Sequence, residues 1–177
     1  MGVLEVSLFV GLTGLAVVAS LHSWRADESY GFFRFFGFES IAALVAWNSR
    51  AWFQDPFSAQ QILSWALLLG SAGLAAHGFY LLRKVGRAQR RVMEETEVLV
   101  QAGVYRFIRH PLYASLLLLG WGAFLKRLDW TGALLALGGT FFWIATAGEE
   151  ERFNTTRFGE RYQDYVRRTK MFVPFLL

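Results

Sequence analysis

The stretch Gly103-Val-Tyr-Arg-Phe-Ile-Arg-His-Pro-Leu-Tyr113 decides how the fold is interpreted, because it places ionisable side chains directly before a long apolar run. Pro111 lacks a backbone N–H and fits best in the first turn of a helix, so the sequence predicts that a helix begins here. The residues from Leu112 to Leu125 are almost all apolar. Arg109 and His110 are therefore expected at the mouth of an apolar helix, near a membrane surface.

The composition indicates an integral membrane protein. The chain has 177 residues, of which 54% are hydrophobic and 17% aromatic, and its mean hydropathy is +0.31. These values are too apolar for an ordinary soluble domain of this length. There is no cysteine, which excludes disulfides, thiolate nucleophiles and cysteine metal sites. The net charge of +4 is modest and the basic residues lie in clusters beside apolar runs, so nucleic acid is not an expected partner.

Apolar runs along the chain predict an all-α fold of about five transmembrane helices in one domain, residues 1–177. A helix rises about 1.5 Å per residue, so runs of this length can cross a hydrocarbon core of about 30 Å. Three spans fill residues 1–83, and residues 84–177 form a cofactor-binding half that contains a helical hairpin. The expected spans are Val3–Leu21, Phe32–Trp47, Ile62–Leu82, Leu112–Leu125 and Trp130–Gly148.

Basic residues set the expected orientation. A cluster after the third span contains Arg83, Lys84, Arg87, Arg90 and Arg91, and the positive-inside tendency puts such a loop in the cytoplasm. With five spans, the charged, amphipathic carboxyl-terminal segment lies in the cytoplasm too. We therefore expect a multi-pass protein of a prokaryotic inner or plasma membrane whose polar site faces the cytoplasm. The sequence does not indicate an oligomeric state.

A candidate site follows from the hairpin. The connection at residues 126–129 is so short that the fourth and fifth spans must be antiparallel. Arg109, His110 and Tyr113 should then lie close to the glutamates of residues 149–151. Arginine could pair with the carboxylate of a zwitterionic cofactor, and glutamate with its ammonium group or ribose hydroxyls. The alternative is an interfacial arginine, a capping histidine and a solvated helix end.

Two further ionisable side chains fall inside expected spans. Glu39 and His77 could face a cavity, as such groups often do, or could make an ordinary hydrogen bond between helices. Tyr162 and Tyr165 could close over a site or lie on the lipid surface. No paired-histidine zinc motif and no dinucleotide fingerprint occurs, so no metal is expected.

Two sequence blocks resemble the isoprenylcysteine carboxyl methyltransferase family and its phospholipid methyltransferase relatives, in particular small prokaryotic members. The first block is Leu99-Val-x-x-Gly103-x-Tyr105-x-x-x-Arg109-His-Pro-x-Tyr113. The second contains Glu150-Glu151, then Phe158-Gly-x-x-Tyr162-x-x-Tyr165 and a closing Pro174. The resemblance covers roughly the carboxyl-terminal half of the chain.

The resemblance implies a membrane methyltransferase that uses S-adenosylmethionine and releases S-adenosylhomocysteine. The acceptor would be a lipid or prenylated small molecule in an apolar tunnel. Glu150, Glu151 and Glu39 are candidates for the base that an amine or thiol acceptor needs, and Arg168 matches a basic position that meets an acidic substrate. The residues implied for the cofactor site are Tyr105, Arg109, His110, Pro111, Tyr113, Glu150 and Glu151.

The sequence departs from the family pattern at two places. Ser115 stands where the family often has glycine, and Arg168-Thr-Lys170 stands where it often has arginine, valine and proline. Two other functions remain open. Membrane sterol reductases, which use a nicotinamide cofactor, resemble the same half of the chain, and a non-catalytic membrane scaffold could keep the fold.

Overall fold

The computed structural model describes residues 2–25, 30–86 and 98–174. Within these ranges the regular elements are helical, apart from one isolated bridge between Ile108 and Lys170. Two short 3-10 helices, η1 (Ser49–Ala51) and η2 (Gly103–Arg106), accompany the α-helices. The α-helices are α1 (Val3–Arg25), α2 (Tyr30–Trp47), α3 (Ala59–Lys84), α4 (Pro111–Phe124), α5 (Trp130–Phe158) and α6 (Glu160–Arg168).

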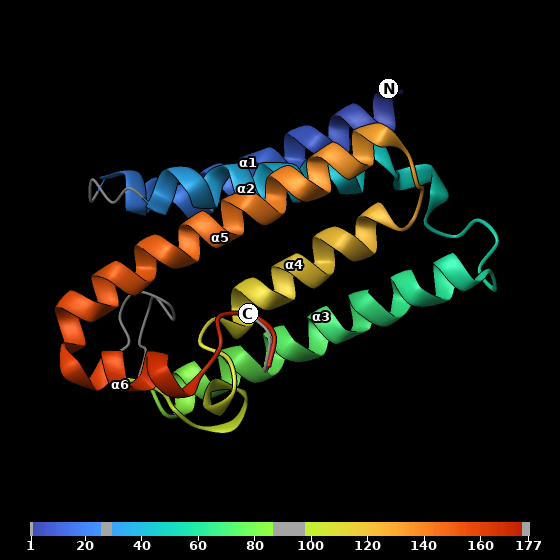
Figure 1. The fold of residues 1–177 in the computed structure, drawn as a ribbon. Coiled ribbons are helices and arrows are strands. Elements are labelled where there is room, and N and C mark those ends of the chain that lie inside the picture. The colour runs from blue at the N-terminus through green and yellow to red at the C-terminus, as the bar shows by residue number, and fades with distance from the viewer. Residues whose placement is uncertain (1, 26–29, 87–97, 175–177) are drawn as a thin grey trace.

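The helices form two layers (Figure 1). Helix α2 packs against α1 and α5 in one layer, and α3 packs against α4 in the other. Between the layers, Ile41 of α2, Tyr113 of α4 and Trp143 of α5 share a buried core with Phe172. The expected antiparallel hairpin is confirmed as α4 and α5. Phe172, at the start of the apolar residues 172–177, therefore packs on protein, while residues 175–177 lie outside the described ranges.

Local sequence explains where these helices begin. The Ser58 hydroxyl accepts a hydrogen bond from the Gln61 N–H at 3.3 Å and caps α3. The Asp129 carboxylate accepts from the Gly132 N–H at 2.7 Å and caps α5, and Pro111 occupies the first turn of α4, as the sequence predicts. Such side chains satisfy donors that a helix start leaves unpaired.

Helix α5 continues beyond the predicted end of the fifth span. The apolar pattern predicted that this span ends at Gly148, but the helix continues to Phe158 and includes Glu149, Glu150 and Glu151. It ends at Gly159, whose φ of 58° suits glycine, and α6 follows. The charged segment therefore consists of the last part of α5 and the separate helix α6, which meet at Gly159.

Two helices, α3 and α5, are long and apolar enough to cross a membrane, judged by length and composition. Residues Val3–Val18 and Pro111–Phe124 form shorter apolar helices. All five expected spans are helical in the structure, but a five-span topology with a cytoplasmic carboxyl-terminal segment stays a prediction. Arg87, Arg90 and Arg91, on which the expected orientation partly depends, lie outside the described residues.

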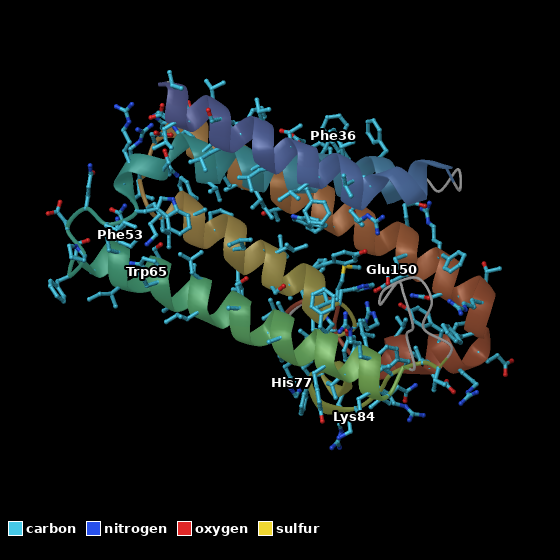
Figure 2. All side chains as sticks on the ribbon, turned by 180° about the vertical axis from the view of Figure 1, so that it is seen from behind. Phe36, Phe53, Trp65, His77, Lys84 and Glu150 are labelled. Carbon is cyan, nitrogen blue, oxygen red and sulfur yellow. The ribbon has the colours of Figure 1, made fainter. Side chains whose placement is uncertain are left out.

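Trp65 lies at the end of the bundle far from Glu150 (Figure 2), and the buried cation Lys126 packs against its ring. Lys126 is only 2% exposed, and its Nζ donates to Gln61 Oε1 at 3.1 Å. The same Nζ lies 3.8 Å from the ring centroid of Trp65 and 5.4 Å from that of Trp52. Burial lowers the pKa of Lys126 because it penalises the charged form. The contacts hold the α4–α5 turn against α3 and the segment that precedes it.

Replacing Lys126 with methionine should lower the free energy of unfolding by about 1–2 kcal/mol, because a desolvated cation–π contact of this kind disappears. Unfolding in detergent by titrated denaturant measures the change. Lys84→Met is the matched control, since Lys84 lies 5.2 Å from the Tyr80 ring centroid at an exposed position. Equal stability of the Lys126 and Lys84 variants would show that the buried contact stabilises nothing.

Candidate active site at the end of the helical hairpin

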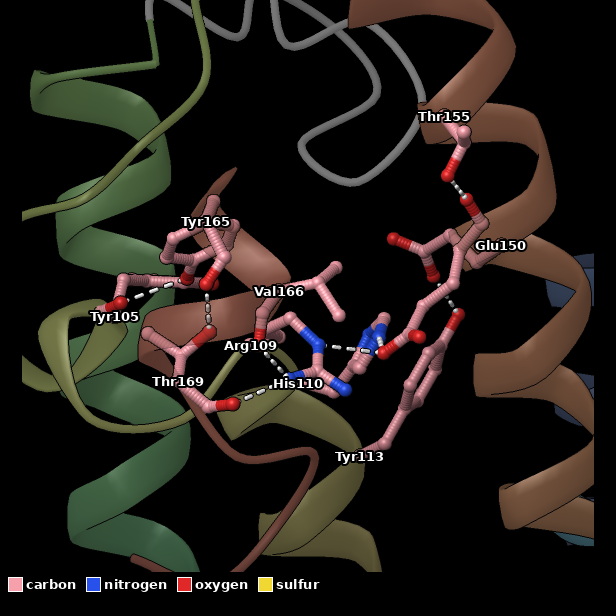
Figure 3. Close-up of polar contacts among 10 residues, drawn as sticks. Tyr105, Arg109, His110, Tyr113, Glu150, Thr155, Tyr165, Val166 and Thr169 are labelled. Carbon is pink, nitrogen blue, oxygen red and sulfur yellow. Dashed lines mark hydrogen bonds and ion pairs between the residues drawn. The ribbon is translucent and has the colours of Figure 1, made fainter. Parts of the chain in front are cut away.

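The hairpin brings the start of α4 next to the second half of α5, and α6 closes a third side. Glu151 Oε1 accepts a hydrogen bond from Arg109 Nε at 2.6 Å and lies 3.2 Å from His110 Nε2 (Figure 3). Arg109 and His110 are 9% and 4% exposed in their side chains. Two consecutive residues before α4 thus share one carboxylate oxygen of α5.

Glu150 has a different environment. Its Oε2 accepts a hydrogen bond from the Tyr113 hydroxyl at 2.6 Å. The Tyr113 ring lies between two others, with centroids 5.5 Å from His110 and 5.4 Å from Trp143. This aromatic stack fixes the phenol that orients Glu150. In the part of the chain that the structure describes, no basic side chain pairs with Glu150.

A pocket opens beside Glu150. Its cavity volume is about 70 Å³, which is smaller than the roughly 300–1,000 Å³ of typical ligand sites. A ligand of cofactor size must therefore extend through the open side. The lining residues are Leu82, residues 98–100, Tyr105, Arg109, His110, Pro111, Leu112, Tyr113, Glu150, Asn154, Phe158, Tyr162 and Tyr165.

Three tyrosines of this lining are buried and stay neutral. Burial raises the pKa of Tyr105, and the Glu150 charge adds to the effect. Burial likewise raises the pKa of Tyr162 and of Tyr165. A neutral phenol can donate a hydrogen bond, and the Tyr165 hydroxyl donates to the Tyr105 carbonyl at 2.7 Å. The pocket thus combines hydrogen-bond donors, aromatic faces and one carboxylate that has no cationic partner among the described residues.

A comparison with known families covers three of the helices that line this pocket. Residues 59–161 match the model of the phospholipid methyltransferase family. The chain belongs to the phospholipid methyltransferase family. The matched range includes α3, α4 and α5, hence Arg109, His110 and both glutamates. The family expected from the two sequence blocks is therefore confirmed.

Curated relatives match parts of the chain. A cobalt-zinc-cadmium resistance protein, CzcN, of Cupriavidus metallidurans is 40% identical over 84 residues, 46% of this chain and 38% of that protein. A methanethiol S-methyltransferase of Mycobacterium tuberculosis is 32% identical over 115 residues, 64% of this chain and 46% of that enzyme. One from Pseudomonas sp. (strain GM41(2012)) is 28% identical over 136 residues, 75% of this chain and 51% of that enzyme. The chain thus spans about half or less of each relative, and no solved structure matches it significantly.

Three predicted site residues of this phospholipid methyltransferase family member lie away from the pocket. Glu39 lies between α2 and α1, where its Oε2 accepts a hydrogen bond from the Thr13 hydroxyl at 3.0 Å. His77 is exposed on the outer side of α3 and points away from Glu150 (Figure 2). Arg168 is exposed on α6. None of the three is among the lining residues.

Two lining residues were not predicted for the site: Asn154 was not singled out in the sequence, and Phe158 was noted only as part of the second block. Asn154 and Phe158 follow Glu150 at intervals of four residues on α5, and such spacing places side chains on one face of a helix. The signal was present in the sequence, but using it required knowing that α5 continues past Gly148. No group of histidine, aspartate and glutamate side chains suited to a metal ion occurs among the described residues.

Proposed function

We propose that the protein transfers a methyl group from S-adenosylmethionine to a small or lipid-borne acceptor at the membrane surface. The observation that carries this proposal is the Glu150 carboxylate, which lines an aromatic pocket without a basic partner among the described residues. A carboxylate in such surroundings favours a positively charged ligand group. S-adenosylmethionine carries an ammonium and a sulfonium, whereas NADPH is strongly anionic.

The lining residues fit the parts of this cofactor. Glu150 would face its ammonium or sulfonium group, and Phe158, Tyr162 and Tyr105 offer aromatic faces to the adenine. Asn154 and the neutral phenols can hydrogen-bond to ribose hydroxyls or to the carboxylate. The bound cofactor supplies a methyl group on an already activated sulfonium. The protein's task is then to hold donor and acceptor in line and to exclude water.

The acceptor is proposed to be a thiol or amine, whose proton must be removed. Of the three carboxylates predicted for that task, Glu150 lines the pocket, Glu151 is held by Arg109 and His110, and Glu39 lies between α1 and α2. Both methyltransferases among the relatives described above carry the name methanethiol S-methyltransferase, which favours a thiol as the acceptor. Arg168 is exposed and does not line the pocket, which weighs against an acceptor carboxylate held by that side chain.

The size of the cavity bears on how an acceptor enters. A long acyl or prenyl tail does not fit into about 70 Å³, so a lipid acceptor would insert only its reactive head. Leu82 of α3 and Leu112 of α4 line the pocket and offer apolar contacts for the carbon next to the nucleophile. We propose that the acceptor enters from the bilayer and the cofactor from the cytoplasm.

Transfer of a labelled methyl group tests the function. Purified protein in lipid nanodiscs would receive labelled S-adenosylmethionine with methanethiol, phosphatidylethanolamine or a prenylated cysteine as acceptor. We expect label in the thiol product, and Glu150→Gln should abolish it. Label only in the phospholipid or the prenylated cysteine would replace the thiol assignment. No label in any product, with no binding of S-adenosylhomocysteine, would refute methyl transfer.

A further inference from the structure

Arg109 lines the pocket, yet its guanidinium hydrogen bonds go to the protein. Nε donates to Glu151 at 2.6 Å, and Nη1 donates to the carbonyl of Thr169 at 2.6 Å and to that of Val166 at 3.4 Å (Figure 3). The two carbonyls belong to the carboxyl-terminal end of α6, where the helix dipole is negative and favours a cation. The positive charge of Arg109 is therefore already matched by Glu151 and the end of α6.

Backbone hydrogen bonds surround this contact. The N–H of Arg109 donates to the Lys170 carbonyl at 2.8 Å, and that of His110 donates to the Met171 carbonyl at 3.1 Å. In the opposite direction, the Lys170 N–H donates to the Phe107 carbonyl at 3.0 Å. We call residues 169–172 the carboxyl-terminal strap. The strap and the segment before α4 are thus paired along both backbones, and Arg109 lies at the centre of the pairing.

We propose that Arg109 is a positioning residue that fastens α6 and the carboxyl-terminal strap to α5, and that it does not hold the carboxylate of the cofactor. A planar guanidinium can serve Glu151 and two carbonyls at once, which the single ammonium of lysine cannot reproduce. Tyr162 and Tyr165 reach the pocket from α6, so loosening α6 displaces one side of the site. The inference rests on the proposed function, because it assumes that the pocket binds S-adenosylmethionine.

The test compares S-adenosylhomocysteine with its decarboxylated form, so the two ligands differ only in the carboxylate. Arg109→Lys should weaken the binding of S-adenosylhomocysteine by about tenfold or more, as the loss of charged hydrogen bonds implies. Decarboxylated S-adenosylhomocysteine should lose affinity by the same factor, because a displaced α6 affects both ligands equally. If the variant loses affinity only for the ligand that has the carboxylate, Arg109 binds that carboxylate and the proposal is overturned. Failure of the wild type to bind either ligand would instead refute the proposed function.

Hydrogen exchange of the ligand-free protein tests the positioning role independently of methyl transfer. In Arg109→Lys, the backbone amides at positions 109, 110 and 170 should exchange faster than in the wild type. Arg167→Lys is the matched control, since Arg167 is exposed on α6 and pairs with Asp164 there. Unchanged exchange in Arg109→Lys would overturn the proposal.

A second variant leaves Arg109 intact. Lys170→Pro removes the N–H that donates to Phe107, at a residue whose side chain is exposed and outside the pocket. It should weaken the binding of both ligands by equal factors, as Arg109→Lys does. The two substitutions combined should reduce the affinity by less than the product of their separate factors. Unchanged affinity for both ligands in Lys170→Pro would contradict a role of the strap in the site, even if Arg109→Lys failed to fold.

Discussion

Replacing Glu150 with glutamine should weaken the binding of S-adenosylhomocysteine by about a hundredfold and leave the protein folded. A hydrogen bond to a charged group contributes about 1.5–3 kcal/mol, and Glu150 is the lining carboxylate without a basic partner among the described residues. The glutamine carbonyl can still accept the hydrogen bond from Tyr113. The substitution therefore removes the charge while it keeps the size and the local contact, and calorimetric titration of the detergent-purified variant measures the loss.

The neighbouring residue supplies the control. Glu149 pairs with Arg152 at 2.8 Å on the same helix and is not among the lining residues. Glu149→Gln should bind the ligand as the wild type does. If Glu150→Gln also binds as the wild type does, the charge of Glu150 has no part in ligand binding and the assignment of the pocket fails.

Replacing Trp143 with alanine should lower the free energy of unfolding by about 3 kcal/mol. Large-to-small changes of aromatic core residues cost about 3–5 kcal/mol in soluble proteins, and we expect the low end because helices in lipid gain chiefly from packing. Trp143 is 1% exposed. It stacks on Tyr113 and meets Phe38 edge-on with ring centroids 5.0 Å apart. A Cβ on Gly37 would lie 2.8 Å from its ring, so α2 approaches the indole closely.

An exposed tryptophan on the same helix serves as the comparison. Trp130 is 86% exposed, and Trp130→Ala should change stability by less than about 0.5 kcal/mol. Unfolding in mixed micelles with increasing denaturing detergent gives both values. Equal loss in the two variants would show that the stack of His110, Tyr113 and Trp143 contributes no stability.

The helices and the hairpin could be predicted because hydropathy and length reflect the bilayer directly. Five apolar runs became helices, and the connection at residues 126–129 allowed no arrangement of α4 and α5 other than an antiparallel one. The approach of Arg109 and His110 to Glu151 follows from that topology alone. The family blocks added the expectation that Tyr105 belongs to the same site, whereas Tyr162 and Tyr165 were expected either over a site or on the lipid surface. All three tyrosines line the pocket.

Other features of the site could not be predicted from the sequence. The pairing of the strap with residues 107–110 joins backbone groups, whose partners side-chain patterns do not reveal. The partners of Arg109 depend on where α6 ends, and that depends on the bend at Gly159. Glu39 was a fair candidate for the site because charged groups inside spans are rare. Its position depends on which face of α2 contacts α1. Apolar residues occur on all sides of α2, so the sequence does not predict that face.

Calorimetric titration of the detergent-purified wild type with S-adenosylhomocysteine and, separately, with NADPH tests the central claim most directly. Saturable binding of S-adenosylhomocysteine at one site per chain, without binding of NADPH, is the predicted result. Binding of NADPH alone would identify a nicotinamide site in the same pocket and contradict the assignment. Binding of neither ligand would contradict it too and would favour a non-catalytic scaffold.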